Sequence, residues 1–125
     1  MARILVIDNE PDLREMLEQT LKPAGYEVIL AADGREGMER HSTSPADLVI
    51  ADLYTLIQDG SETIRELRSR FPKVAIIAMS GRPDTGTMLP LAQNLPIVGI
   101  LPKPFLTDEL IAVVGKALGG QSPAL

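Results

Sequence analysis

Two short stretches, Ile4-Leu5-Val6-Ile7-Asp8 and Leu48-Val49-Ile50-Ala51-Asp52, are apolar runs that each end on an aspartate. Two further runs, 74–79 and 97–102, are followed by Ser80 and Lys103. Apolar runs of this length predict buried strands, and here they alternate with stretches at helical spacing. This alternation favours an α/β fold with a doubly wound parallel sheet. In such a sheet the four polar side chains would share the rim where ligands bind.

The spacing predicts the individual elements. We expect strands near residues 4–7, 26–31, 48–51, 74–79 and 97–101, and helices near 11–21, 35–41, 61–70 and 107–118. The helix at 35–41 has few apolar residues and is expected to pack lightly, whereas 53–60 is expected to be a loop. Thr107 is a suitable cap for the last helix. Pro and Gly residues in 81–95 predict that a fourth helix there is short or irregular.

Composition limits the classes of protein. A length of 125 residues favours one domain, which we place at 1–118, with a C-terminal tail or linker stub at 119–125. The absence of Cys excludes disulfides and thiolate chemistry and fits a cytoplasmic protein. The net charge of −5 argues against nucleic-acid binding, and the apolar run near the N-terminus is too short for a signal peptide or a membrane span. The single histidine, His41, is expected to be exposed and not to bind metal, since one histidine makes no ligand cluster.

The polar residues at the strand ends suit phosphate chemistry. Asp8, Glu10 and Asp52 supply carboxylates and Asn9 an amide oxygen, which are the hard ligands that Mg²⁺ prefers. Such crowded carboxylates repel one another unless a cation joins them. Lys103 and the Ser80 hydroxyl can bind the oxygens of a phosphoryl group, and Asp52 can act as the nucleophile.

These residues, taken together, resemble the receiver domain of bacterial two-component response regulators over roughly residues 3–118. The matching stretches are 4–10, 45–53, Gln58-Asp59-Gly60, Met79-Ser80-Gly81 and Leu101-Pro102-Lys103-Pro104-Phe105. The resemblance implies a flavodoxin-like five-stranded sheet in the order 2-1-3-4-5, with helices on both faces. It also implies a cis Lys103–Pro104 bond.

The resemblance further implies a signalling domain rather than an enzyme. Asp52 would accept a phosphoryl group from a histidine kinase or phosphotransfer protein. Mg²⁺ would lie at Asp8, Asn9, Asp52 and the Tyr54 carbonyl, with Glu10 as an additional candidate, and Ser80 and Lys103 would bind the phosphoryl group. Phosphorylation would switch the region after the fourth strand and alter partner contacts. The downstream partner would bind the face made by the fourth helix, fifth strand and last helix. A homodimer is also possible, and no membrane contact is implied.

The chain departs from the usual pattern of this family at three informative positions. Asn9 stands where a second aspartate is usual, which predicts weaker Mg²⁺ binding unless Glu10 compensates. Ile100 occupies the position of a switch aromatic residue, so a swinging ring is excluded as the switch. Leu56 replaces the usual proline in the stretch after Asp52.

Other functions stay open at this point. A degenerate receiver, which binds partners without taking up phosphate, is favoured by Asn9 but opposed by Asp52, Ser80 and Lys103. An aspartate-nucleophile phosphatase would typically carry Asp-x-Asp after the first strand, and Asp8-Asn9-Glu10 does not supply it. A flavodoxin-like cofactor binder lacks the phosphate-cradling loop after that strand.

Overall fold

The computed structural model describes residues 1–58, 66, 69, 70, 74–80 and 97–119. Five parallel strands form one sheet in the order β2-β1-β3-β4-β5, which confirms the predicted topology. The strands are β1 (Arg3–Ile7), β2 (Glu27–Ala31), β3 (Leu48–Asp52), β4 (Ala75–Ser80) and β5 (Ile97–Pro102).

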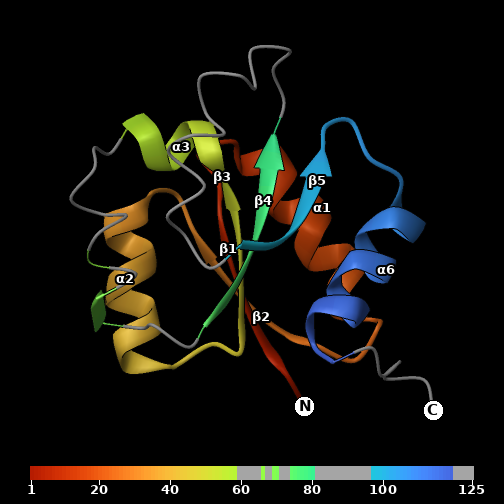
Figure 1. Ribbon diagram of the computed structural model, residues 1–125, viewed down its shortest axis with the longest axis horizontal. Helices are drawn as coiled ribbons and strands as arrows, with labels where there is room; N and C mark the ends of the chain where they lie inside the picture. The colour runs from red at the N-terminus through yellow and green to blue at the C-terminus, as the bar shows by residue number, and fades with distance from the viewer. Residues whose placement is uncertain (59–65, 67–68, 71–73, 81–96, 120–125) are drawn as a thin grey trace.

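Helices cover both faces of this sheet. They are α1 (Pro11–Leu21), α2 (Gly34–Thr43), α3 (Leu53–Gln58) and α6 (Thr107–Ala117). Helices α1 and α6 lie on one face and α2 lies on the other (Figure 1). Most of the helix predicted at 61–70, all of the irregular segment predicted at 81–95 and the tail from 120 onward lie outside the described residues.

Side chains of the central strands alternate between two apolar clusters. Ile4 and Val6 of β1 join the cluster that contains Leu17 of α1 and Leu110 of α6. Leu5 and Ile7 join a second cluster, which contains Met38 of α2. Because helices cover both faces of β1, its run from Ile4 to Ile7 is apolar throughout, as is usual in parallel sheets. Each such side chain contributes about 1.5–3 kcal/mol when fully buried.

The expectation that α2 packs lightly is wrong. Its buried residues include Gly37, Met38 and His41. A Cβ built on Gly37 would lie 2.6 Å from the Ile7 Cδ1 atom, so the helix backbone lies directly against the Ile7 side chain of β1. Close packing here depends on the absence of a side chain, which a count of apolar residues does not detect.

The predicted loop at 53–60 is also wrong over its first part, since α3 begins directly after β3. The Asp52 Oδ1 atom accepts a hydrogen bond from the Tyr54 N–H at 2.8 Å and thereby caps the first turn. Leu53 is buried and packs with Ala78 of β4. Leu56 in place of proline leaves the backbone N–H available to the helix.

Two further expectations are corrected. The N-cap of α6 is Leu106 rather than Thr107, and the Leu106 N–H donates to the Glu109 Oε1 atom at 2.9 Å. The second correction concerns His41, which was expected to be exposed. It is buried, with only 3% of its surface exposed. Its Nδ1 atom accepts a hydrogen bond from the Ala46 N–H at 2.9 Å, and burial lowers the pKa of the imidazole.

Candidate functional site

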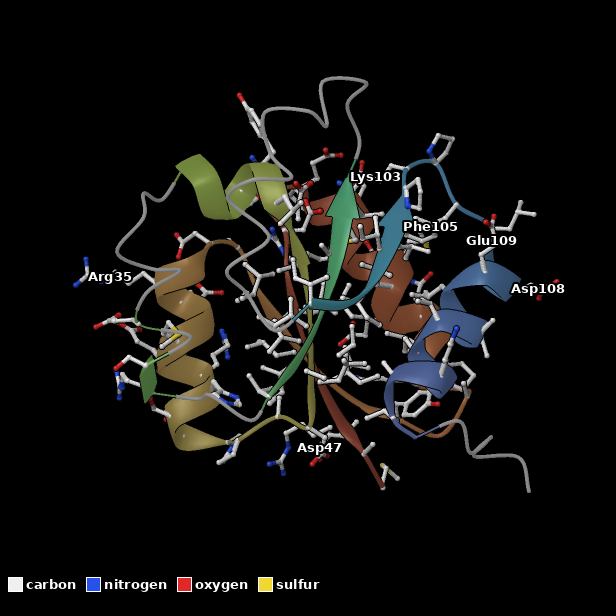
Figure 2. The ribbon with its side chains drawn as sticks, in the orientation of Figure 1. Arg35, Asp47, Lys103, Phe105, Asp108 and Glu109 are labelled. Carbon is white, nitrogen blue, oxygen red and sulfur yellow. The ribbon has the colours of Figure 1, made fainter. Side chains whose placement is uncertain are left out.

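Strand register brings the ends of β1, β3 and β5 together. Ile7 pairs with Ala51, so Asp8 and Asp52 follow at equivalent positions on adjacent strands. Lys103 comes directly after β5, at the same end of the sheet (Figure 2). The Lys103–Pro104 bond is cis, as predicted.

One ammonium group joins the two aspartates. The Lys103 Nζ atom lies 3.0 Å from Asp8 Oδ2 and 2.5 Å from Asp52 Oδ2. The side chains of Lys103, Asp8 and Asp52 are 17%, 0% and 9% exposed, respectively. Two carboxylates and one ammonium group leave this buried cluster with one excess negative charge.

The second oxygen of each carboxylate binds the backbone. Asp8 Oδ1 accepts from the Glu10 N–H and Asp52 Oδ1 accepts from the Tyr54 N–H, both at 2.8 Å. Each aspartate therefore holds the start of the segment that follows it while its Oδ2 atom faces Lys103. Both carboxylates are therefore held by one backbone N–H each and by the shared Lys103 ammonium group.

Burial and the contacts within the cluster shift the pKa values of Asp8 and Lys103. Burial raises the pKa of Asp8, although hydrogen bonds from Glu10 and Lys103 partly oppose the shift. Burial lowers the pKa of Lys103, but its hydrogen bonds to Asp52 and Asp8 outweigh this, and the net shift is upward. Lys103 therefore stays protonated, while Asp8 ionises less readily than a solvated aspartate.

Two contacts that the sequence did not suggest hold the loop between β1 and α1. The Arg14 guanidinium donates to the Asp8 carbonyl oxygen at 2.7 Å. The Asn9 N–H donates to the Thr55 Oγ1 atom at 3.3 Å, and Thr55 is buried in α3. A loop at 53–60 gives Thr55 no predicted role; the signal that the sequence offers is its position one helical turn after Asp52.

The remaining predicted site residues are Asn9, Glu10, Tyr54 and Ser80, which lie near this cluster in the sequence or at the same end of the sheet. Asn9 and Glu10 are exposed beside Asp8, and Tyr54 is half-buried in the first turn of α3. Ser80 ends β4, next to Pro102 of β5, but its side chain lies outside what the structure describes.

The donor set fits a hard divalent cation. Among the described residues, no three His, Cys, Asp or Glu side chains form a group that could hold a metal. However, two carboxylates already converge on one cationic group, and the Asn9 amide and Tyr54 carbonyl are neutral oxygen donors nearby in sequence. Oxygen donors of this kind, completed by water, suit Mg²⁺.

Comparison with known proteins identifies the family. The sequence model that defines the response regulator receiver domain family matches residues 4–115 of this chain. The chain therefore belongs to the response regulator receiver domain family, the signalling domains of two-component systems, which are not classical enzymes. Members of this family generally bind Mg²⁺ at the site of phosphorylation.

Within the described residues, no helix combines the length and apolarity needed to cross a membrane.

Relatives with known names agree with this family. The chain is 34% identical over 122 residues to the response regulator MprA of Mycolicibacterium vanbaalenii, covering 98% of this chain and 52% of that protein. It thus spans about half the length of the curated relatives that it matches.

Solved structures show the same fold. CheY4, a chemotaxis response regulator of Vibrio cholerae, has a TM-score of 0.82 at 28% identity, over 94% of this chain and 99% of that one. The response regulator TrrA of Thermotoga maritima, solved in complex with Mg²⁺ and BeF, has a TM-score of 0.79 at 32% identity, over 94% and 100% of the two chains.

Proposed function

We propose that this domain accepts a phosphoryl group on Asp52 from a histidine kinase or a phosphotransfer protein. The observation that carries the proposal is the Lys103 ammonium group between Asp8 and Asp52, buried at the carboxyl end of the sheet. A nucleophile and a phosphate-binding cation are thereby in contact before any ligand arrives.

In the proposed transfer, an Asp52 carboxylate oxygen forms a bond to phosphorus. The bond from phosphorus to the donor nitrogen breaks, and its electron pair stays on the imidazole of the donor. Lys103 stays protonated because its net pKa shift is upward, so it can pair with a phosphoryl oxygen as charge accumulates there. We further propose that the Ser80 hydroxyl binds another oxygen, which its position at the end of β4 supports.

Asp8, Asp52, the Asn9 amide and the Tyr54 carbonyl are the proposed Mg²⁺ ligands, with Glu10 as an additional candidate. When bound, the metal would neutralise charge on the phosphoryl group. The similarity to TrrA, whose structure contains Mg²⁺ and BeF, supports this assignment. Asn9 is neutral, so the affinity is expected to be lower than that of a site with a further carboxylate.

We propose that the output depends on the region following Ser80 and on partner contacts at the face that includes β5 and α6. Ile100 of β5 is 49% exposed and carries no ring. A change at the end of β4 is therefore a better candidate for the switch than an aromatic rotation.

A phosphorylation-independent binding module is the second candidate. It is favoured by Asn9, which brings a neutral amide where a second aspartate is usual, but opposed by the presence of Asp52, Ser80 and Lys103. Mass spectrometry after incubation with Mg²⁺ and acetyl phosphate separates the two functions. A phosphoryl adduct in the wild type that is absent in Asp52→Ala supports the receiver function. No adduct, together with no response to beryllofluoride, supports the binding module.

A further inference from the structure

We infer that Thr55 is a positioning residue, which holds the Asn9 backbone and thereby sets the geometry of the proposed Mg²⁺ site. The inference rests on the proposed function and deepens it. It assigns a role to the contact between the Thr55 hydroxyl of α3 and the loop that carries Asp8 and Asn9.

The backbone of this loop is held at successive positions. The Asp8 N–H donates to the Ala31 carbonyl oxygen of β2, and the Asp8 carbonyl accepts from Arg14. The Glu10 N–H folds back onto Asp8 Oδ1. These contacts stay within β1, α1 and β2, whereas the Asn9 N–H reaches across to Thr55 of α3.

Thr55 is itself fixed relative to Asp52. It lies in the first turn of α3, which Asp52 Oδ1 caps through the Tyr54 N–H and which Leu53 anchors against β4. Thr55 as a whole residue is 2% exposed, and a β-branched residue in a helix has few χ1 rotamers. The hydroxyl is thus a rigid acceptor three residues after Asp52.

The contact therefore links the two segments that follow the proposed metal-binding carboxylates. Mg²⁺ requires nearly octahedral geometry, so its affinity depends on how these segments are spaced. Asn9 contributes a neutral amide rather than a charged oxygen, and a weak ligand depends more on being held in place. The bond between the Asn9 N–H and Thr55 is only partly buried, so the fold should depend on this contact less than the metal site does.

The test compares Thr55→Val, which keeps the shape but removes the acceptor, with Thr55→Ser, which keeps the hydroxyl. Calorimetric titration of Mg²⁺ gives the affinity, and thermal unfolding in EDTA gives the stability. Thr20→Val is the control, since the Thr20 hydroxyl binds the Met16 carbonyl within α1.

We expect Thr55→Val to weaken Mg²⁺ binding by about tenfold or more, as loss of residues that orient metal ligands typically does. Thr55→Ser and Thr20→Val should stay within about twofold of the wild type on the same scale. Equal affinities of wild type and Thr55→Val would overturn the inference and leave the proposed function intact. Equal losses in the Val and Ser variants would assign the effect to disturbed packing at this buried position rather than to the hydroxyl, and would also overturn the inference. Failure of the wild type to bind Mg²⁺ and to form the phosphoryl adduct would overturn the proposed function as well.

Discussion

Replacing Lys103 with methionine removes the charge that joins the acid pair while keeping an unbranched apolar chain of similar length. The Nζ atom lies 2.5 Å from Asp52 Oδ2 and 3.0 Å from Asp8 Oδ2, and both aspartate side chains are almost fully buried. Without the ammonium group, two carboxylates face each other at adjacent strand ends. Removing one partner of a buried ion pair typically costs about 3–5 kcal/mol of stability.

Proton uptake sets an upper limit to this loss. One carboxyl group of the pair can escape the repulsion by binding a proton, which for an aspartate of ordinary pKa costs about 4 kcal/mol at pH 7 and about 1.5 kcal/mol at pH 5. We therefore expect Lys103→Met to lose about 3–4 kcal/mol at pH 7. The variant raises a carboxyl pKa in the folded state, so the penalty is present above the pKa of the unfolded chain and shrinks as the pH falls.

Urea unfolding followed by far-ultraviolet circular dichroism, in EDTA at pH 7 and pH 5, measures the loss, with wild type compared at each pH. Lys116→Met in α6 is the control and should change stability by less than about 1 kcal/mol. Adding Mg²⁺ should stabilise Lys103→Met more than wild type, because the metal then displaces no ammonium group. A loss below about 1 kcal/mol at pH 7 would refute the reasoning. An equal loss at both pH values would show that packing, not charge, is responsible.

Three further predictions concern single side chains. Asn9→Asp should tighten Mg²⁺ binding about tenfold by calorimetry, since a further carboxylate near a divalent cation contributes at least about 1 kcal/mol; equal affinities would contradict the ligand assignment. Gly37→Ala should lose about 1–3 kcal/mol in urea unfolding because the new Cβ would meet Ile7, whereas Gly115→Ala, which meets no atom within 4 Å, should gain up to about 1 kcal/mol; similar effects at both glycines would exclude close packing of α2. Burial lowers the pKa of His41, so the folded state resists protonation and wild type should lose stability as the pH falls below about 6.5, relative to His41→Asn; parallel pH profiles of the two proteins would argue against a buried neutral imidazole.

Most of the architecture was predictable because parallel strands buried on both faces leave a strong apolar signal. The runs at 4–7 and 48–51 correspond to β1 and β3 within one residue at either end. Helix α1 begins at Pro11 and ends at Leu21, where the sequence placed it. Local pattern was sufficient here because several signals favoured the same elements. The apolar spacing indicates the helix, Pro11 suits its first turn, and Pro23 and Gly25 follow its end.

Errors arose where a local pattern was weak and a distant contact decided the outcome. Helix α2 has few apolar residues, yet it packs closely because Gly37 lets its backbone approach Ile7. His41 is polar, yet it is buried with the Ala46 N–H as its partner. Helix α3 has no strong local pattern, because its first turn depends on a cap by the Asp52 side chain.

The sequence by itself determined the family, the strand order that this family implies and the residue types at the rim. It also determined that Asn9 brings one carboxylate fewer to the proposed metal site, because charge is a property of composition. Tertiary structure alone decided that Lys103 joins Asp8 to Asp52 and that Thr55 and Arg14 hold the intervening loop. These contacts join residues up to 95 positions apart, and side-chain geometry at that separation is set by the packing of the sheet, which no local pattern encodes.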